Sequence, residues 1–188
     1  LTAFAPVSRL TVDVHTLDVY GSLPVNTLKE LIAYAEAKPG ALSYASAGLG
    51  SPNHMNMEQL KHDAGIDRVH VPYQGSGPSV IGLLAGGVHV ISSSSASLVQ
   101  HVKSGKLKAL AVGGSRRLSV LLDVPTVAES GLPKFEPNMP WFSILAPAKT
   151  PSAIIATINA QVERTLADPE MVNAWWTWVA WRAAARPK

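Results

Sequence analysis

Residues 44–54 read Tyr44-Ala-Ser-Ala-Gly-Leu-Gly-Ser-Pro-Asn-His54, which predicts the end of a buried strand, a glycine turn and the start of a helix. Gly48 and Gly50 permit positive φ angles and a close approach of the backbone to a ligand. Ser51 is a good N-cap, and Pro52 suits the first helical position because its missing N–H is not needed there. Outward-pointing N–H groups at such a turn lie at the positive end of a helix dipole, which favours an anion. The same pattern also fits an ordinary capped turn between a strand and a helix.

The composition indicates a globular chain. Its 188 residues are 47% hydrophobic and 15% charged, which suits one large domain or two smaller lobes. The net charge is +3 and the basic residues are scattered, so no nucleic-acid partner is expected. The sequence has no cysteine, which excludes disulfides, thiolate metal sites and a cysteine nucleophile. No apolar run is long enough to insert into a membrane. No signal peptide is visible and the first residue is Leu1, so we expect a processed or truncated product.

Short apolar strands alternate with helical patterns along most of the chain. The expected strands are residues 42–45, 68–71, 88–91, 107–112 and 141–147, with one or two more within residues 1–23. The expected helices begin at the capping box Thr27–Glu30, at Pro52, at Pro78, at Ala96 and at Pro151, with a short helical piece over 124–129. The last helix carries an apolar stripe of Ile154, Ile155, Ile158, Val162 and Leu166. This order predicts an α/β fold with a doubly wound, mainly parallel sheet, four-stranded over residues 24–125 and covered by helices on both faces.

A second turn, from Tyr73 to Gly77, follows the next expected strand. The carboxyl ends of parallel strands meet at one edge of a sheet, and ligands bind there. Both turns offer glycine N–H groups, a hydroxyl and a proline-initiated helix, and neither contains Lys or Arg. The two turns together therefore favour a small carboxylate over a phosphate-rich ligand.

Other motifs do not fit. Residues 48–53 lack the third glycine of a dinucleotide fingerprint, and Ser51 lies outside a hydrolase nucleophile elbow. The six histidines show no metal-binding spacing, so neither a cofactor nor a metal site is expected. His54 could face the cleft from the first turn of its helix. We interpret Tyr73 as a ligand contact, with a packed strand-end aromatic as the alternative.

Five motifs occur in an order that resembles a known family. They are Tyr44–Ser51 with His54, His70-Val-Pro-Tyr-Gln-Gly75, Gly105–Val112, Asp123–Glu129 with Gly131, and Leu145-Ala-Pro147 with Thr150-Pro151. Together they resemble the substrate-binding proteins of tripartite tricarboxylate transporters, the Bug-type receptors. The resemblance runs from about Phe4 to Glu170.

The resemblance implies a periplasmic receptor with a periplasmic-binding-protein-like lobe and part of a second lobe, joined by hinge strands. Residues 1–23 would hold the hinge and part of lobe 1, 24–125 lobe 2, and 126–188 the return to lobe 1 with the C-terminal helices. Such a receptor closes on a small carboxylate and delivers it to membrane components, without catalysis. The ligand-binding positions implied are Ser46, Gly48, Gly50, Ser51, Tyr73, Gln74 and Gly75, with Ala47, His54 and Ser93 as further possibilities.

The chain also departs from the family. Two glycine-bearing ligand loops expected upstream are missing, His89 stands where Asp is common, and Leu122 stands where Pro usually precedes the Asp. The Trp-rich end, with Trp175, Trp178 and Trp181 at three-residue spacing, does not resemble the family and could be a buried stripe. Two alternative functions stay open: an enzyme using Ser51 or a cleft histidine, and the effector-sensing domain of a regulator, which would need a helix-turn-helix segment.

Overall fold

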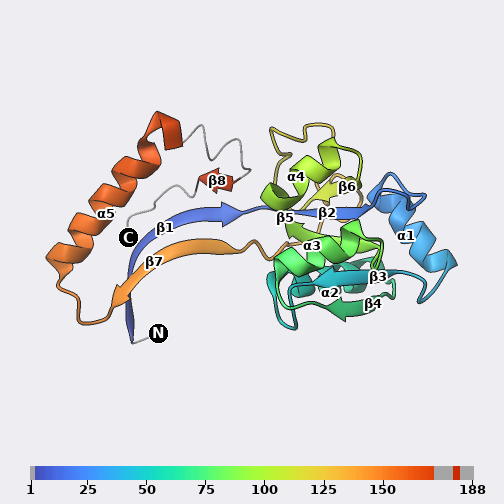
Figure 1. Cartoon of the computed structure of the whole chain (residues 1–188), viewed down its shortest axis with the longest axis horizontal. Coiled ribbons are helices and arrows are strands. Elements are labelled where there is room, and N and C mark those ends of the chain that lie inside the picture. Colours follow the sequence, from blue (N-terminus) through green and yellow to red (C-terminus); the bar gives the residue numbers. More distant parts are fainter. Residues whose placement is uncertain (1–2, 172–179, 183–188) are drawn as a thin grey trace. The chain divides into compact units, whose positions relative to one another are not determined.

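The computed structural model describes residues 3–171 and 180–182, and the chain divides into two compact units (Figure 1). Unit 1 combines Leu1–Asp13 with Pro140–Lys188, and unit 2 is the continuous segment Val14–Met139. The chain therefore crosses between the units twice, after Asp13 and after Met139. The expected boundaries were residues 23 and 125, and both differ from those of the structure. The first lies earlier because residues 15–20 form a strand of unit 2. The second lies later because Thr126 pairs with Val112 and the Asn138 amide donates to Asn56.

Unit 2 is built on a five-stranded sheet in the order β4-β3-β5-β2-β6. The strands are β2 (His15–Tyr20), β3 (Ser43–Ser46), β4 (Val69–Pro72), β5 (Val90–Ser94) and β6 (Leu107–Val112). β3 pairs in parallel with β4 and β5, whereas β2 runs antiparallel between β5 and β6. Four strands share one direction, which confirms the mainly parallel sheet, and β2 adds a fifth strand to the four expected.

Helices cover both faces of this sheet, as predicted (Figure 1). α1 (Leu28–Ala37) and α2 (Pro52–Ala64) pack over one core cluster that includes Leu31, Met57 and Val19 of β2. α3 (Ser76–Leu84) and α4 (Ser95–Lys103) pack over the other, which includes Leu83 and Leu98. The capping box of α1 forms as expected, because the Glu30 amide donates to Thr27 Oγ1 at 3.1 Å and the Asn26 amide to Glu30 Oε2 at 2.6 Å.

Three local expectations were wrong. Residues 124–129 form a turn, because the Val127 amide bonds the carbonyl of Val112 instead of continuing a helix. α3 begins at Ser76, two residues before Pro78, with Gly75 as its N-cap. The serine run after residue 91 belongs to β5 as far as Ser94.

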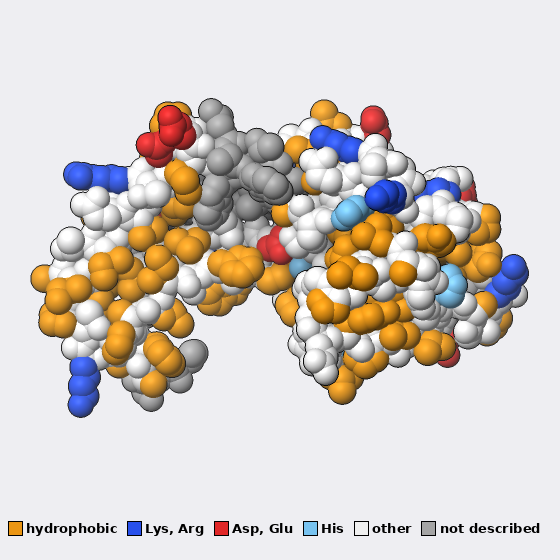
Figure 2. All heavy atoms as spheres, viewed as in Figure 1, with side chains coloured by type: hydrophobic (Ala, Val, Ile, Leu, Met, Phe, Trp, Pro, Cys, Tyr) orange, Lys and Arg blue, Asp and Glu red, His pale blue; other side chains and the backbone are white. Residues whose placement is uncertain are grey.

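Unit 1 contains a three-stranded antiparallel sheet in the order β7-β1-β8 and the helix α5 (Ser152–Ala167). β1 (Phe4–Asp13) pairs with β7 (Trp141–Pro147) from Phe4↔Pro147 to Val12↔Trp141, and with β8 (Ala180–Arg182) near its end. The predicted stripe of α5 is at best half-buried, and Figure 2 shows many hydrophobic side chains on the visible surface of this unit. Trp175 and Trp178 lie outside the described residues, and only the backbone of Trp181, in β8, is described.

Candidate functional site

Two turns lie side by side at the carboxyl edge of the parallel strands. Turn 1 (residues 46–51) joins β3 to α2, and turn 2 (residues 73–75) joins β4 to α3. The Tyr73 amide donates to the carbonyl of Ser46 at 3.0 Å, and the Gly75 amide donates to the carbonyl of Ala47 at 3.2 Å. The sequence predicted that parallel pairing brings these turns together, and they are bonded directly to each other.

Turn 1 is held rigid by its own side chains. The Ser46 hydroxyl is fully buried and accepts a hydrogen bond from the Gly48 amide at 3.1 Å. The Ser51 hydroxyl donates to the carbonyl of Gly48 at 2.7 Å and caps α2 by accepting from the His54 amide at 3.3 Å. Gly48 and Gly50 have φ angles of 125° and 73°, so both use the conformational freedom that the sequence predicted.

The glycine amides do not point outward as expected. The Gly48 amide donates to Ser46 Oγ, the Gly75 amide to the Ala47 carbonyl, and the Gly50 amide to His54 Nδ1 at 3.1 Å. Within the described residues, the amides of Ala47, Leu49 and Gln74 make no hydrogen bond. These three amides, with the helix N-termini beside them, form the part of the edge that can receive an anion.

The remaining candidate side chains have different surroundings. The ring of Tyr73 packs on α3, because a Cβ added to Gly82 would lie 2.2 Å from the Tyr73 hydroxyl oxygen. Gln74 is exposed beside turn 1. Ser93 is buried near the carboxyl end of β5, opposite Thr16 of β2. Because β5 pairs in parallel with β3 at Ala45↔Ile91, this end of β5 lies at the same edge of the sheet as turn 1.

A stack of three rings adjoins turn 1, and the sequence analysis missed two of them. The rings of His54 and His70 lie 4.3 Å apart at 24°, and Tyr44 stacks on His70 at 4.8 Å. His70 Nε2 lies 2.7 Å from Ser46 Oγ, so this histidine supports the residue that holds Gly48. The usable signal was the pairing of parallel neighbours, since Tyr44 and His70 occupy the same register position on β3 and β4.

Charged groups surround this stack. The Tyr44 hydroxyl donates to Glu58, and Lys61 Nζ lies 3.1 Å from the same carboxylate. Burial acts to raise the pKa of Glu58, but the hydrogen bonds from Tyr44 and Lys61 outweigh it and hold the pKa below its usual value. Burial lowers the pKa of His70, and the neighbouring His54 adds to this effect.

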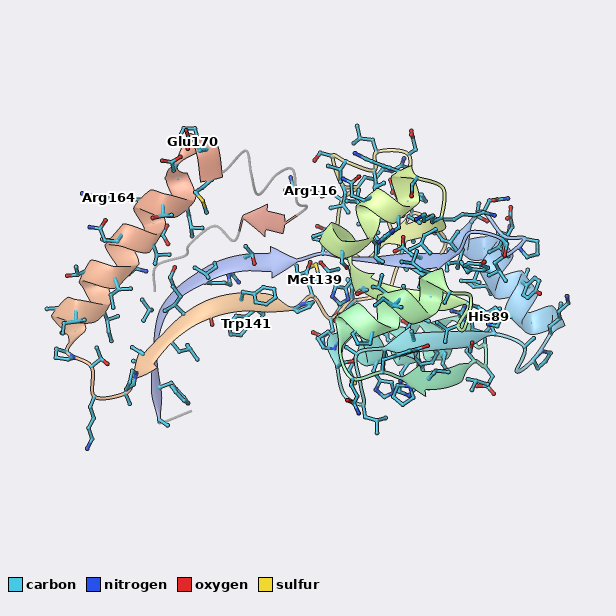
Figure 3. All side chains as sticks on the ribbon, in the orientation of Figure 1. His89, Arg116, Met139, Trp141, Arg164 and Glu170 are labelled. Atoms are coloured by element: carbon cyan, nitrogen blue, oxygen red, sulfur yellow. The ribbon has the colours of Figure 1, made fainter. Side chains whose placement is uncertain are left out.

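His89, labelled in Figure 3, lies away from the turns. Its Nδ1 accepts from the Ser43 amide at 3.1 Å, at the start of β3, whereas both turns follow strand ends. Within the described residues, no group of three or more His, Asp or Glu side chains is placed to hold a metal ion. In the same part of the chain, no helix combines the length and hydrophobicity needed to cross a membrane.

A mainly parallel sheet with helices on both faces and paired turns at its carboxyl edge is the architecture of an α/β ligand-binding lobe. Residues 1–176 match the family model described as "Tripartite tricarboxylate transporter family receptor", so the chain belongs to this family.

Relatives and solved structures agree with this assignment. The chain is 38% identical to Protein BugT of Bordetella pertussis over 154 residues, which is 81% of this chain and 46% of BugT. It is also 38% identical over 148 residues to a UPF0065 protein of Pseudomonas sp. (strain P51), covering 78% of this chain and 44% of that protein. The chain therefore spans about half the length of these curated relatives.

Two similar structures were solved with carboxylates. A protein of R. palustris with adipate superposes with a TM-score of 0.90 at 32% identity, over 96% of this chain and 60% of that one. MatC from Rhodopseudomonas palustris with bound malate gives a TM-score of 0.87 at 31% identity, over 96% and 61%.

Proposed function

We propose that this chain is the ligand-binding part of a periplasmic receptor that takes up a small carboxylate and presents it to the membrane components of a tripartite transporter. The observation that carries the proposal is the pair of mutually bonded turns, in which the amides of Ala47, Leu49 and Gln74 make no hydrogen bond to the described part of the chain. Two helices begin at these turns, so their dipoles favour an anion there. The likeness to structures solved with adipate and malate supports a carboxylate as the ligand class.

Binding without catalysis fits the chemistry of the turns. The Ser51 hydroxyl is used as the cap of α2, and in the described residues it is bonded only to backbone groups of Gly48 and His54. A serine nucleophile needs a base side chain within hydrogen-bond reach. The family assignment and this geometry both favour a receptor over the enzyme alternative.

The test is a thermal-shift and calorimetric screen with adipate, malate and the neutral diamide of adipate. A ligand that binds only the folded state raises the melting temperature by mass action, so the two carboxylates should raise it and the diamide should not. No shift with any carboxylate in a panel of chain lengths would count against the proposal.

Gly50→Val locates the site, and Gly40→Val is its matched control. Both glycines have φ angles of 73° and open space around the missing Cβ, so both substitutions carry similar backbone strain. Gly50 follows β3 at the proposed site, whereas Gly40 precedes β3 at the opposite edge. We expect similar losses of stability, with carboxylate affinity lost only for Gly50→Val. Equal affinities for the two variants would place the site elsewhere.

A further inference from the structure

We infer that His54 is a proton-binding residue coupled to turn 1: protonation frees the Gly50 amide and puts a positive charge beside it, so the carboxylate binds more tightly as the pH falls. This inference rests on the proposed function and adds a regulation of the same site. It requires that one imidazole nitrogen switch from acceptor to donor next to the ligand.

The switch follows from one hydrogen bond. The Gly50 amide donates to His54 Nδ1 at 3.1 Å, which fixes His54 as the neutral tautomer with its proton on Nε2. A protonated imidazole carries hydrogen on both nitrogens and can no longer accept this bond. The Gly50 amide then becomes a fourth donor beside those of Ala47, Leu49 and Gln74, on a residue flanked by open space.

The surroundings direct the proton to His54 and not to its stacked neighbour. His70 of β4 is the more constrained ring, because burial and the charge of His54 both lower its pKa. Its Nε2 stays bonded to Ser46 Oγ at 2.7 Å, which keeps turn 1 in shape. Glu58, one helical turn after His54 on α2, is the anion that favours charge on His54.

The other charged or titratable groups of the cluster are already engaged. Lys61 of α2 opposes a further positive charge, but it is bonded to Glu58 and lies 3.7 Å from Asp67. Tyr44 of β3 donates to Glu58, and burial raises its pKa, so it stays neutral throughout the relevant range. Tyr44, Glu58 and Lys61 are therefore bonded to one another, whereas His54 accepts its bond from the Gly50 amide of turn 1.

Coupling between a proton and a ligand is reciprocal. An anion at turn 1 favours the protonated form of His54, so binding must take up protons at pH values where His54 is partly neutral. Affinity then rises as the pH falls from about 7.5 to about 6. We expect a rise of roughly fivefold or more, the lower end of typical coupling between sites.

The first experiment needs no ligand. Nitrogen-15 NMR of the ligand-free protein should show the Gly50 amide titrating together with the His54 imidazole. In His54→Asn, whose side-chain oxygen can still accept the bond, the Gly50 amide should not titrate. His62→Asn is the matched control, because His62 lies on the exposed side of the same helix. If the chemical shift of the Gly50 amide does not change as the His54 imidazole is protonated, the inference is overturned.

The second experiment measures binding of adipate and malate at pH 6.0 and 7.5 by calorimetry in two buffers of different ionisation enthalpy. The parent and His62→Asn should gain affinity at pH 6.0 and take up protons, whereas His54→Asn should not. Titration of the ligand is common to all three proteins and cancels in the comparison. If His54→Asn binds the carboxylates with the same pH dependence as the parent, the coupling is overturned but the proposed function stands. If neither adipate and malate nor any other carboxylate of the panel binds at either pH, the proposed function is refuted and the coupling with it.

Discussion

The side-chain amide nitrogen of Asn56 lies 3.3 Å from His15 Nδ1 and donates to the carbonyl of Asn138 at 3.2 Å. The Asn138 amide returns a bond to Asn56 Oδ1 at 2.7 Å. His15 and Asn138 stand next to the two points where the chain enters and leaves unit 2. One buried side chain on α2 therefore anchors both ends of the unit.

Asn56→Ala should lower the free energy of unfolding by about 2 to 3 kcal/mol, because it leaves buried polar groups without partners. Urea denaturation followed by circular dichroism measures the change. Asn53→Ala on the same helix is the control, since Asn53 is also buried but makes one bond, to the carbonyl of Ser92 at 2.7 Å. Equal losses for the two variants would show that the anchor adds nothing beyond a single hydrogen bond.

Asp18 should make unit 2 less stable as the pH rises. It lies within β2 between Ile91 and Ala109, fully buried, and its carboxylate oxygens have no hydrogen-bond partner in the described residues. Burial raises its pKa from 3.8 to about 7. Because the folded value is above the unfolded one, the stabilisation is full below about pH 4 and is lost as the pH rises through 7.

Asp18→Asn mimics the protonated acid and should remove this pH dependence. The variant and the parent should be similar at pH 4, and the variant should be more stable at pH 8 by up to about 4 kcal/mol. Thermal melts across this range measure the difference, with the exposed Asp123→Asn as control. The prediction is wrong if the difference in stability between the parent and Asp18→Asn is the same at pH 4 and at pH 8.

His15 should act in the opposite direction at acid pH. Burial lowers its pKa from 6.5 to about 4, so it stabilises the fold fully above pH 6.5 and loses this contribution as the pH falls to 4. Its imidazole resonances in NMR should keep the neutral form down to pH 5. A charged His15 at pH 6 would be inconsistent with its burial.

Gly82→Ala should destabilise unit 2 by roughly 1 to 3 kcal/mol, because the new Cβ would overlap the ring of Tyr73. Gly77→Ala, in the same helix and with open space around its Cβ, should be neutral or stabilising. A double-mutant cycle with Tyr73→Leu should recover most of the loss. If Tyr73→Leu does not restore stability to Gly82→Ala, overlap with the Tyr73 ring is not the cause of the loss.

Local chemistry explains which parts of the fold the sequence predicted. Ser51 and Pro52 start α2, and Gly65 ends it in the left-handed conformation. Thr27 and Glu30 form the capping box of α1. All of these contacts lie within a few residues of one another. The boundaries of β7 were also predicted correctly. Each of these elements is specified by its own short segment.

Contacts between distant segments explain what could not be predicted. The antiparallel position of β2 depends on pairing with β5 and β6, far along the chain. The use of the Gly50 amide by His54 depends on a side-chain rotation, and the packing of Tyr73 depends on a missing Cβ at Gly82. Such contacts form only in the assembled structure, so they leave no periodic pattern of residues in the sequence.

The pairing of β1 fixes an order of folding. Phe4 pairs with Pro147, and both partners of β1, β7 and β8, lie after residue 140, so β1 must wait for nearly the whole chain to be synthesised. Unit 2 is a continuous segment and can fold first. When it does, Asn56 holds His15 and Asn138 together, and the loop that separates β1 from β7 becomes short. Folding of unit 2 therefore lowers the entropic cost of closing that loop, which favours the pairing of β1 with β7 in the sheet of unit 1.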